Sequence, residues 1–499
     1  MKTKYDISGL LCLMAFMPSC DYQSGGMSEK PNVIIILTDD IAYGDLGCYG
    51  ATRVKTPHID RLAAEGLRFT DAYAPASTCT PTRFALLTGK YAWRNNVGVV
   101  NGDAPMSIEP GSLTLPELFR KAGYMTACIG KWHLGLGEGR TNYNTQITPG
   151  VRNVGFDYSF YIPSTNDRVP CVYIENDRVV GLDPDDPIEI DYIKKIGNLP
   201  TGKENPDLLK LMYYKGHDHT IINGISRIGY MSGGTAAHWV DETIADTITA
   251  KAVNFIRQNS SRPFFLYFAP VNIHEPRTPG PRFAGKSDCG VYCDFIEELD
   301  WSVGEILRVL AETNQDNNTW IIFTSDNGPE IKEGYLDGAL ENLNGHNPKA
   351  GFRGGKYTLF EAGTRLPFIS WWPNFIKPGV TDALFGYIDL YASFANFLNI
   401  NISEEKNIDS RDALRVITGE KATTEHNEVL IQDNGGRLAI RKGDWKLIPD
   451  GSHGATDGEY LFNIAEDKFE KHNLVTEHPD IRDDLKEKIR IIREYDTKH

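Results

Sequence analysis

The chain has 499 residues, of which 41% are hydrophobic and 24% charged, a composition typical of a soluble globular protein with a large core. Its formal net charge of -15 argues against a nucleic-acid-binding surface. We therefore expect one large and one smaller domain, and any affinity for an anionic ligand must come from a local cluster of cations.

The first twenty residues have the features of an export signal. Lys2 and Lys4 precede an apolar segment, residues 7–17, that is too short to span a bilayer, and Ser19-Cys20 follows. A small residue before a cysteine resembles the bacterial lipoprotein cleavage site, which predicts lipid attachment at Cys20 and a location in the periplasm or on the outer membrane. Ordinary cleavage near Ser19, which would leave a freely soluble protein, is the alternative. No later segment has the pattern of a membrane span.

Two apolar segments predict central strands of an α/β domain that covers residues 31–420. Residues 32–37 (NVIIIL) form a continuous β-branched run that stops at Asp39-Asp40, as expected of a parallel strand buried on both faces. Residues 320–325 repeat the design and lead into Asp326-Asn327. Ligands of such sheets bind at the carboxyl ends of the strands, where these polar pairs lie.

Helix signals alternate with the strands. Thr56 and Gly66 bracket one predicted helix, Thr114 and Glu117 stand at capping-box spacing before a second, and residues 294–312 show helical apolar spacing. Residues 168–238 are rich in Asp, Pro, Gly and aromatic residues and predict a long ordered insertion that shapes specificity. Residues 428–499 contain four short apolar segments and a charged helix, which predicts a small antiparallel sheet covered by that helix.

A cysteine stands in an unusual place in STCTPTRFALLTG. Cys79 lies in a polar turn just before an apolar helix, whose first backbone N–H groups would point back at it. Such a position favours negative charge, unlike the apolar surroundings of a structural cysteine. Of the other cysteines, Cys289 and Cys293 can either form a disulfide or remain free thiols, and none has zinc-site spacing.

Other polar residues follow predicted strands. Asp39, Asp40, Asp326 and Asn327 offer four side-chain oxygens suited to Ca²⁺ or Mg²⁺, although a lone acidic pair is usually a solvated strand end. Lys131 and His133 are two apart, so an extended backbone would direct both side chains to one side. A loop lysine and a satisfied histidine are the plainer interpretation of that pair. His274 follows an apolar strand, and Lys356 lies in a glycine-rich turn, where a surface lysine is the plainer interpretation.

Five segments resemble the type I sulfatases. CTPTRFALLTG is similar to the Cys-x-Pro-x-Arg signature whose cysteine is oxidised to formylglycine, with Thr82 where the family commonly has serine. GYMTACIGKWHLG, TSDNG and FRGGKYTLFEAGTRLPFI resemble later blocks in the family's order, and EYLFNIAEDKFEKHNL resembles its C-terminal subdomain. The resemblance implies an alkaline-phosphatase-like fold: a large, mixed, mostly parallel sheet between helices, followed by a small antiparallel sheet with a helix.

The resemblance also implies a sulfuric ester hydrolase with one divalent cation, calcium in preference to magnesium, and a formylglycine that a maturase makes from Cys79. The cation would be held by Asp39, Asp40, Asp326, Asn327 and residue 79. The sulfate would be surrounded by Arg83, Lys131, His133, His274 and Lys356. The hydrated aldehyde would attack sulfur, His274 or Lys356 would protonate the leaving alcohol, and His133 would deprotonate the second hydroxyl so that sulfate leaves.

The expected substrate is a sulfated carbohydrate of host or algal glycans, namely galactose or N-acetylgalactosamine 6-sulfate. Two other functions remain open from the sequence. A phosphomonoester or phosphonate hydrolase could use the same fold, and a catalytically dead domain could bind sulfated glycans.

Overall fold

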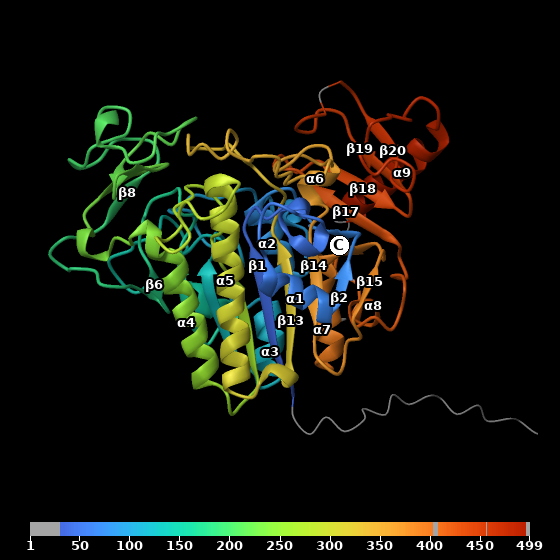
Figure 1. Cartoon of the computed structure of the whole chain (residues 1–499), viewed down its shortest axis with the longest axis horizontal. Helices are drawn as coiled ribbons and strands as arrows, with labels where there is room; N and C mark the ends of the chain where they lie inside the picture. Colours follow the sequence, from blue (N-terminus) through green and yellow to red (C-terminus); the bar gives the residue numbers. More distant parts are fainter. Residues whose placement is uncertain (1–29, 403–407, 456, 496–499) are drawn as a thin grey trace, which may run out of the picture. The chain divides into compact units, whose positions relative to one another are not determined.

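A ten-stranded sheet forms the centre of the protein (Figure 1). The computed structural model describes residues 30–402, 408–455 and 457–495, so the predicted export signal lies outside the described residues. In spatial order the sheet comprises β15 (Gly379–Thr381), β2 (Leu67–Phe69), β14 (Phe368–Trp371), β13 (Thr319–Ser325), β1 (Asn32–Thr38), β12 (Phe264–Ala269), β4 (Met125–Lys131), β5 (Tyr158–Ile162), β6 (Ile174–Glu175) and β7 (Arg178–Val179).

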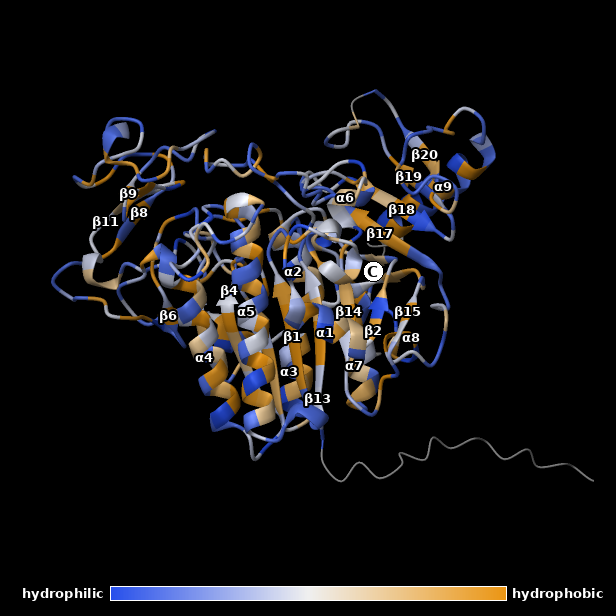
Figure 2. Ribbon diagram, in the orientation of Figure 1, coloured by the Kyte–Doolittle hydropathy of each residue, from blue (hydrophilic) through white to orange (hydrophobic). Residues whose placement is uncertain are grey.

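The middle of the sheet is parallel and its flanks are mixed. Strands β13, β1, β12, β4 and β5 pair in parallel, whereas β14 and β6 join antiparallel on either side. Every residue of β1 and β13 is buried, which explains their uninterrupted apolar sequences and their hydrophobic colouring in Figure 2. The carboxyl ends of these strands therefore meet at one edge of the sheet.

The helices pack in two groups against this sheet. One group contains α1 (Pro57–Glu65), α4 (Ile244–Gln258) and α5 (Gly290–Glu312), and the other contains α2 (Cys79–Thr88), α3 (Leu115–Lys121) and α7 (Leu390–Phe397). The two remaining short helices of this part of the chain are α6 (Glu361–Thr364) and α8 (Leu414–Ile417). The predicted α/β class, with a mostly parallel sheet between helices, is confirmed.

Two predicted helix starts are right in position, but their caps differ. The Thr114 hydroxyl accepts a hydrogen bond from the Glu117 N–H at 3.3 Å, as predicted. The Thr56 hydroxyl makes no capping bond and instead donates to the Asp60 carboxylate at 3.0 Å. Pro57 at the first helical position needs no partner for its nitrogen, so α1 begins there without that cap.

The insertion is ordered by short strands. It contains β8 (Glu189–Asp191) paired with β11 (Tyr230–Ser232), and β9 (Ile221–Ile222) paired with β10 (Ile225–Ser226). Outside the insertion, a further small pair of strands joins β3 (Ala72–Tyr73) to β16 (Phe385–Gly386). The insertion is therefore a structured attachment to the main sheet, as the sequence predicted.

The last part of the chain forms the predicted antiparallel sheet with a helix. Strands β17 (Glu428–Gln432), β18 (Leu438–Lys442), β19 (Trp445–Ile448) and β20 (Tyr460–Asn463) pair in sequence order, and α9 (Pro479–Tyr495) contacts β18 and β19. Their apolar side chains also contact the main domain, because Ile431, Phe462 and Leu359 share one buried cluster. This C-terminal sheet is thus fused to the larger unit.

Buried charges also join the C-terminal sheet to the main domain. The fully buried Lys446 ammonium lies 2.7 Å from Glu361 and 2.9 Å from Glu470. Glu470 also accepts the Glu361 backbone N–H at 2.7 Å, at the start of α6. Burial raises the pKa of Glu470 to about 7, although Lys446 opposes this shift. Lys446 therefore compensates two carboxyl groups that have no access to water.

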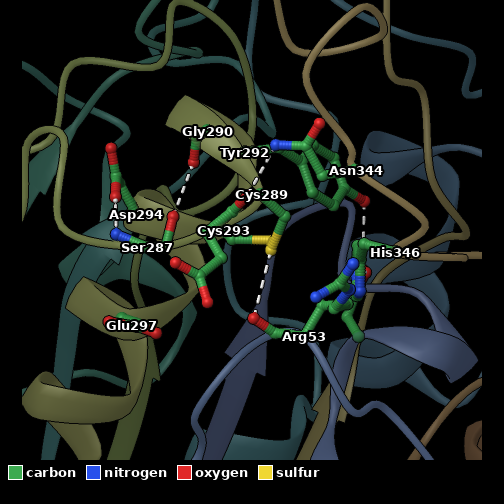
Figure 3. Close-up of a disulfide and its surroundings, with 12 residues drawn as sticks. Arg53, Ser287, Cys289, Gly290, Tyr292, Cys293, Asp294, Glu297, Asn344 and His346 are labelled. Atoms are coloured by element: carbon green, nitrogen blue, oxygen red, sulfur yellow. Dashed lines mark hydrogen bonds and ion pairs between the residues drawn. A yellow bond between two sulfur atoms is a disulfide. The ribbon is translucent and has the colours of Figure 1, made fainter.

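A disulfide closes the first turn of α5. Cys289 and Cys293 are bonded, and the Cys289 sulfur also lies 3.4 Å from the Arg53 carbonyl (Figure 3). Nearby, Tyr292 and His346 both bind the Asp45 carboxylate, at 3.0 and 2.8 Å. The disulfide therefore fixes the part of α5 that supports the loop after β1.

Among the described helices, none combines the length and apolarity needed to cross a membrane.

Replacing Lys446 with methionine should lower the free energy of unfolding by about 3–5 kcal/mol, because it removes the cation next to the buried Glu470, while Glu361 keeps its ion pair with Arg365. The matched control is Lys442→Met on the exposed side of β18, where little change is expected. Denaturant unfolding measures both, and equal stabilities of the two variants would contradict this role of Lys446.

Candidate active site

The predicted site residues converge at the carboxyl ends of four neighbouring parallel strands. Asp326-Asn327 follow β13, Asp39-Asp40 follow β1, His274 lies in the loop after β12, and Lys131 ends β4 with His133 just beyond it. Cys79 and Arg83 come from the first turns of α2, and Lys356 comes from the loop before α6. All of these side chains are buried, so the solvated strand end and the surface lysine are excluded as interpretations.

The acidic and basic residues form a dense ion-pair network. Lys131 lies 2.6 Å from the Asp39 carboxylate, and Lys356 lies 3.1 Å from that of Asp40. Asp40 has a left-handed backbone (φ 60°), so its side chain need not point away from that of Asp39 as on a strand. Burial and the Asp326 charge raise the pKa of Asp39 to about 6, even though Lys131 opposes them.

Arg83 is fully buried and is anchored by Asp326. Its guanidinium donates two hydrogen bonds to Asp326, at 2.6 and 3.0 Å, and further bonds reach the Lys131 carbonyl and the Tyr267 hydroxyl, both at 3.3 Å. The sequence predicted Arg83 beside the sulfate. These hydrogen bonds show that Arg83 orients Asp326, and its place beside the sulfate stays a prediction.

Cys79 is the first residue of α2 and faces His133. The Cys79 sulfur lies 3.2 Å from His133 Nδ1, and His133 Nε2 lies 2.9 Å from the Val100 carbonyl. Because a carbonyl only accepts, Nε2 carries the proton and Nδ1 presents a lone pair to residue 79. Burial and the charge of Lys131 lower the pKa of His133 well below its ordinary value, so the ring is neutral. A neutral ring with an acceptor nitrogen therefore faces residue 79.

His133 faces the site beside Lys131, as predicted, but a turn and not an extended strand directs its side chain there. Lys131 and His133 both reach the site, but His133 has a left-handed backbone (φ 56°) and is not part of β4. The Thr80 hydroxyl donates to the His133 carbonyl at 3.0 Å and ties this turn to the start of α2. The turn, and not strand alternation, positions the imidazole.

A second histidine-containing cluster surrounds Lys356. His274 Nδ1 lies 2.6 Å from the Glu275 carbonyl, which leaves Nε2 as the open nitrogen, 3.7 Å from Glu333. Glu333 also lies 2.8 Å from Lys356 and accepts from the Tyr357 hydroxyl. Burial and the Lys356 charge lower the pKa of His274 to about 3. Sequence reasoning missed Glu333, since an isolated acid in a polar loop carries no motif.

The insertion and the residue just before it supply three further residues that the sequence did not single out. His217 Nε2 lies 3.0 Å from the Asp167 carboxylate, and Arg168 lies 3.1 Å from the same residue. Although burial opposes it, Arg168 and His217 hold the pKa of Asp167 well below its ordinary value. The charge of Arg168 also helps to lower the pKa of His133. Only the general expectation that the insertion shapes the site pointed to them.

Two buried side-chain oxygens are available as ligands for a cation. Asp39 Oδ1 and Asn327 Oδ1 are buried and receive no hydrogen bond from any residue that the structure describes. Ligand atoms of Asp39, Asp40 and His274 lie within 4.8 Å of one another. Carboxylate and amide oxygens suit a hard divalent cation, and a cation would compensate the crowded acids. The residues present therefore fit such an ion.

Known proteins share this architecture. The family model described as sulfatase matches residues 31–400. The chain belongs to the sulfatase family. It is 46% identical to an N-acetylgalactosamine-6-O-sulfatase of Bacteroides thetaiotaomicron, over 99% of this chain and 100% of that protein. It is also 33% identical to human arylsulfatase A, over 74% of this chain and 64% of that protein.

Solved structures agree with the family assignment. A sulfatase from a Bacteroides thetaiotaomicron locus for glycosaminoglycan metabolism superposes with a TM-score of 0.92 and 47% identity, over 94% of this chain and 100% of that one. A Pseudoalteromonas sulfatase gives a TM-score of 0.67 at 25% identity, over 93% of this chain and 89% of that one. The predicted sulfuric ester hydrolase and its fold are confirmed. Sulfatases generally use a formylglycine and a divalent metal ion, which agrees with the buried cysteine and the oxygen cluster of this sulfatase.

Cation binding should stabilise the folded sulfatase. After treatment with a chelator, added Ca²⁺ should raise the melting temperature of the wild type, because a ligand of the folded state alone shifts the unfolding equilibrium. Asp39→Asn should lose most of this rise, whereas Asp382→Asn, at an exposed position, should keep it. Thermal unfolding with Ca²⁺ or Mg²⁺ measures the effect. An equal rise in both variants would place the cation elsewhere.

Proposed function

We propose that this sulfatase hydrolyses the 6-sulfate of galactose or N-acetylgalactosamine units in glycans. The position of Cys79 supports the catalytic part of this proposal. Its sulfur lies 3.2 Å from Nδ1 of His133, and the positive charges of Lys131 and Lys356 act on it. The sugar assignment is supported by the relative named N-acetylgalactosamine-6-O-sulfatase, which aligns over nearly the whole chain. Export to the periplasm or the outer membrane, with a lipid at Cys20 as the one membrane attachment, is part of the proposal.

Two groups absent from the bare chain complete the proposed site. Asp39, Asp40, Asp326 and Asn327 would hold one calcium ion together with residue 79. When bound, the cation would offset the negative charge of the sulfate oxygens and lower the pKa of a coordinated hydroxyl. A maturase would convert Cys79 into formylglycine, whose hydrate has a second hydroxyl that serine lacks and that permits sulfate release.

The chain's own residues then have distinct tasks. Lys131 and Lys356 lie where positive charge can stabilise a sulfate anion without solvent competition. His133 Nδ1 accepts the proton of a hydroxyl at residue 79, since Nε2 donates to Val100. Arg83 keeps Asp326 ionised and oriented through its two hydrogen bonds.

His274 is better suited than Lys356 to protonate the leaving alcohol. Asp40 and Glu333 hold the pKa of Lys356 well above its ordinary value against the effect of burial, so this ammonium keeps its proton. The Lys356 charge is one cause of the low pKa of His274. A bound sulfate anion opposes that charge and therefore favours protonation of His274 at the time of reaction.

The insertion would bind the sugar. Asp167 and His217 form a buried, hydrogen-bonded pair of a carboxylate and an imidazole next to Arg168, and polar groups of this kind are suited to hydroxyl recognition. They are fixed before substrate arrives, because Asn166, next to Asp167, donates to the His274 carbonyl at 3.1 Å. The sugar-binding group is thus tied to the residue proposed to protonate the leaving oxygen.

Cys79→Ala should reduce turnover of a sulfated sugar by more than about 10⁴-fold, since the nucleophile is lost. Its circular dichroism should match that of the wild type, because alanine fits the first turn of α2. Cys48→Ala, at a half-buried cysteine away from the site, is the control and should keep its activity. Substantial activity of Cys79→Ala would exclude the proposed nucleophile.

His274→Ala should impair sugar sulfate hydrolysis by about 10²-fold or more and aryl sulfate hydrolysis far less, since only the poorer leaving group needs a proton. Steady-state kinetics on both substrates, with exposed His472→Ala as control, measures this difference. Equal losses on the two substrates would remove His274 as the proton donor.

The same assay with a panel of sulfated monosaccharides tests which sugar the enzyme prefers. Galactose and N-acetylgalactosamine 6-sulfates should have the highest kcat/KM, because sugar contacts contribute to transition-state binding. Faster hydrolysis of glucosamine sulfates would contradict the sugar assignment and leave the sulfatase assignment intact.

A further inference from the structure

A short ribbon of two paired segments, residues 212–214 and 334–336, borders the candidate active site. Its backbone hydrogen bonds are 2.7 and 2.8 Å long, and Tyr213 faces Tyr335 as an antiparallel pair. Tyr335 is fully buried, so this pair lies on the inner face. Because side chains alternate along paired strands, the residues on either side of the pair lie on the outer face. We call these two segments the rim ribbon.

The His217 ring packs over Gly334, and the rest of the outer face of the rim ribbon is apolar and open. It carries Met212, Tyr214 and Leu336, of which Met212 is 43% and Leu336 47% exposed. Tyr214 is partly buried. An aromatic ring flanked by exposed aliphatic side chains is a surface on which the C–H face of a sugar can pack.

Hydrogen bonds to Glu275, the neighbour of His274, anchor the rim ribbon to the active site. The Glu275 carboxylate, next to His274, accepts the backbone N–H groups of Glu333, Gly334 and Tyr335 at 3.2, 2.6 and 2.9 Å. Glu333, at the start of this segment, contacts Lys356 at 2.8 Å. The rim ribbon is therefore rigidly connected to the residues that surround the sulfate position and lies next to them.

Two lysines make cation–π contacts over the aromatic ring of the rim ribbon. The ammonium groups of Lys215 and Lys332 lie 5.0 and 4.9 Å from the Tyr214 ring centroid. Neither is within ion-pair distance of a carboxylate among the described residues, whereas Lys131 and Lys356 are both paired. In a chain of net charge -15, two adjacent uncompensated cations form a local positive surface.

We propose that the rim ribbon binds a second, anionic sugar unit of the substrate, with Tyr214 packing on its ring and Lys215 and Lys332 pairing with its carboxylate or sulfate. This inference rests on the proposed function, since it concerns the sugar attached to the one that is desulfated. A neutral sugar would gain the packing contact alone. The enzyme is therefore selective for 6-sulfated units within acidic glycans.

The test compares kcat/KM on 6-sulfated N-acetylgalactosamine alone and linked to a uronate, to a sulfated hexose or to a neutral hexose, in both orders of linkage. The wild type should prefer an acidic disaccharide over the neutral one. The double variant Lys215→Gln/Lys332→Gln should lose about 3- to 10-fold on the acidic disaccharides and stay within about two-fold on the monosaccharide, as expected for two exposed ion contacts. The carboxylate and sulfate substrates identify which anion is bound.

Two controls separate local contact from general electrostatics. Lys194→Gln/Lys377→Gln removes the same charge at two exposed lysines and should leave the preference intact. Tyr214→Ala should lower kcat/KM on acidic and neutral disaccharides alike, because it removes the packing surface. Equal losses from both lysine pairs, or a wild type without preference for acidic disaccharides, would overturn the proposal.

A binding measurement keeps this inference separate from the proposed function. Calorimetric titration with the desulfated acidic disaccharide requires no turnover, and the Lys215→Gln/Lys332→Gln variant should bind it about 3- to 10-fold more weakly than the wild type. Unchanged affinity would contradict the rim ribbon as a sugar site. Failure of the wild type to desulfate the monosaccharide would contradict the proposed function instead.

Discussion

Mutual compensation of buried charges is the constraint on which the active end of this sulfatase depends. Asp39, Asp40 and Asp326 are fully buried, and each is paired with a buried cation: Lys131, Lys356 and Arg83, respectively. No member can be removed without leaving an uncompensated charge in a medium where this is costly. The same arrangement leaves two acceptor oxygens without donors, which is the feature that a divalent cation would satisfy.

Holding this cluster together requires contacts from the whole chain. Tyr357 N–H donates to the Ser77 carbonyl at 2.8 Å and Lys356 N–H to the Pro329 carbonyl at 3.0 Å, so one loop touches both the cysteine turn and the β13 turn. Gly328 packs so closely on α6 that an added Cβ would lie 1.8 Å from the Ala362 carbonyl oxygen. The C-terminal sheet supports the same region, since Gln432 pairs with the segment just before Cys79.

Much of this organisation could be predicted from sequence, because strong local patterns encode it. The buried strands β1 and β13 have uninterrupted apolar sequences, and their polar ends gave the metal-binding candidates. The site blocks were found because they combine rare residues at fixed spacing. Glu333, Asp167 and His217 were not predicted, since each is a common polar residue in a loop. Only tertiary structure brings Glu333 to Lys356 and His217 to Asp167. The orientation of Arg83 also depends on distant partners that no local pattern reveals.

The central claim is that position 79 of the mature protein carries the reacting group, and the chemical state of that residue tests it most directly. Mass spectrometry of the tryptic peptide Phe69–Arg83, from protein produced in a host with a sulfatase maturase, should show loss of the thiol and gain of an aldehyde that reacts with a hydrazide probe. An unmodified cysteine in fully active protein would contradict the account.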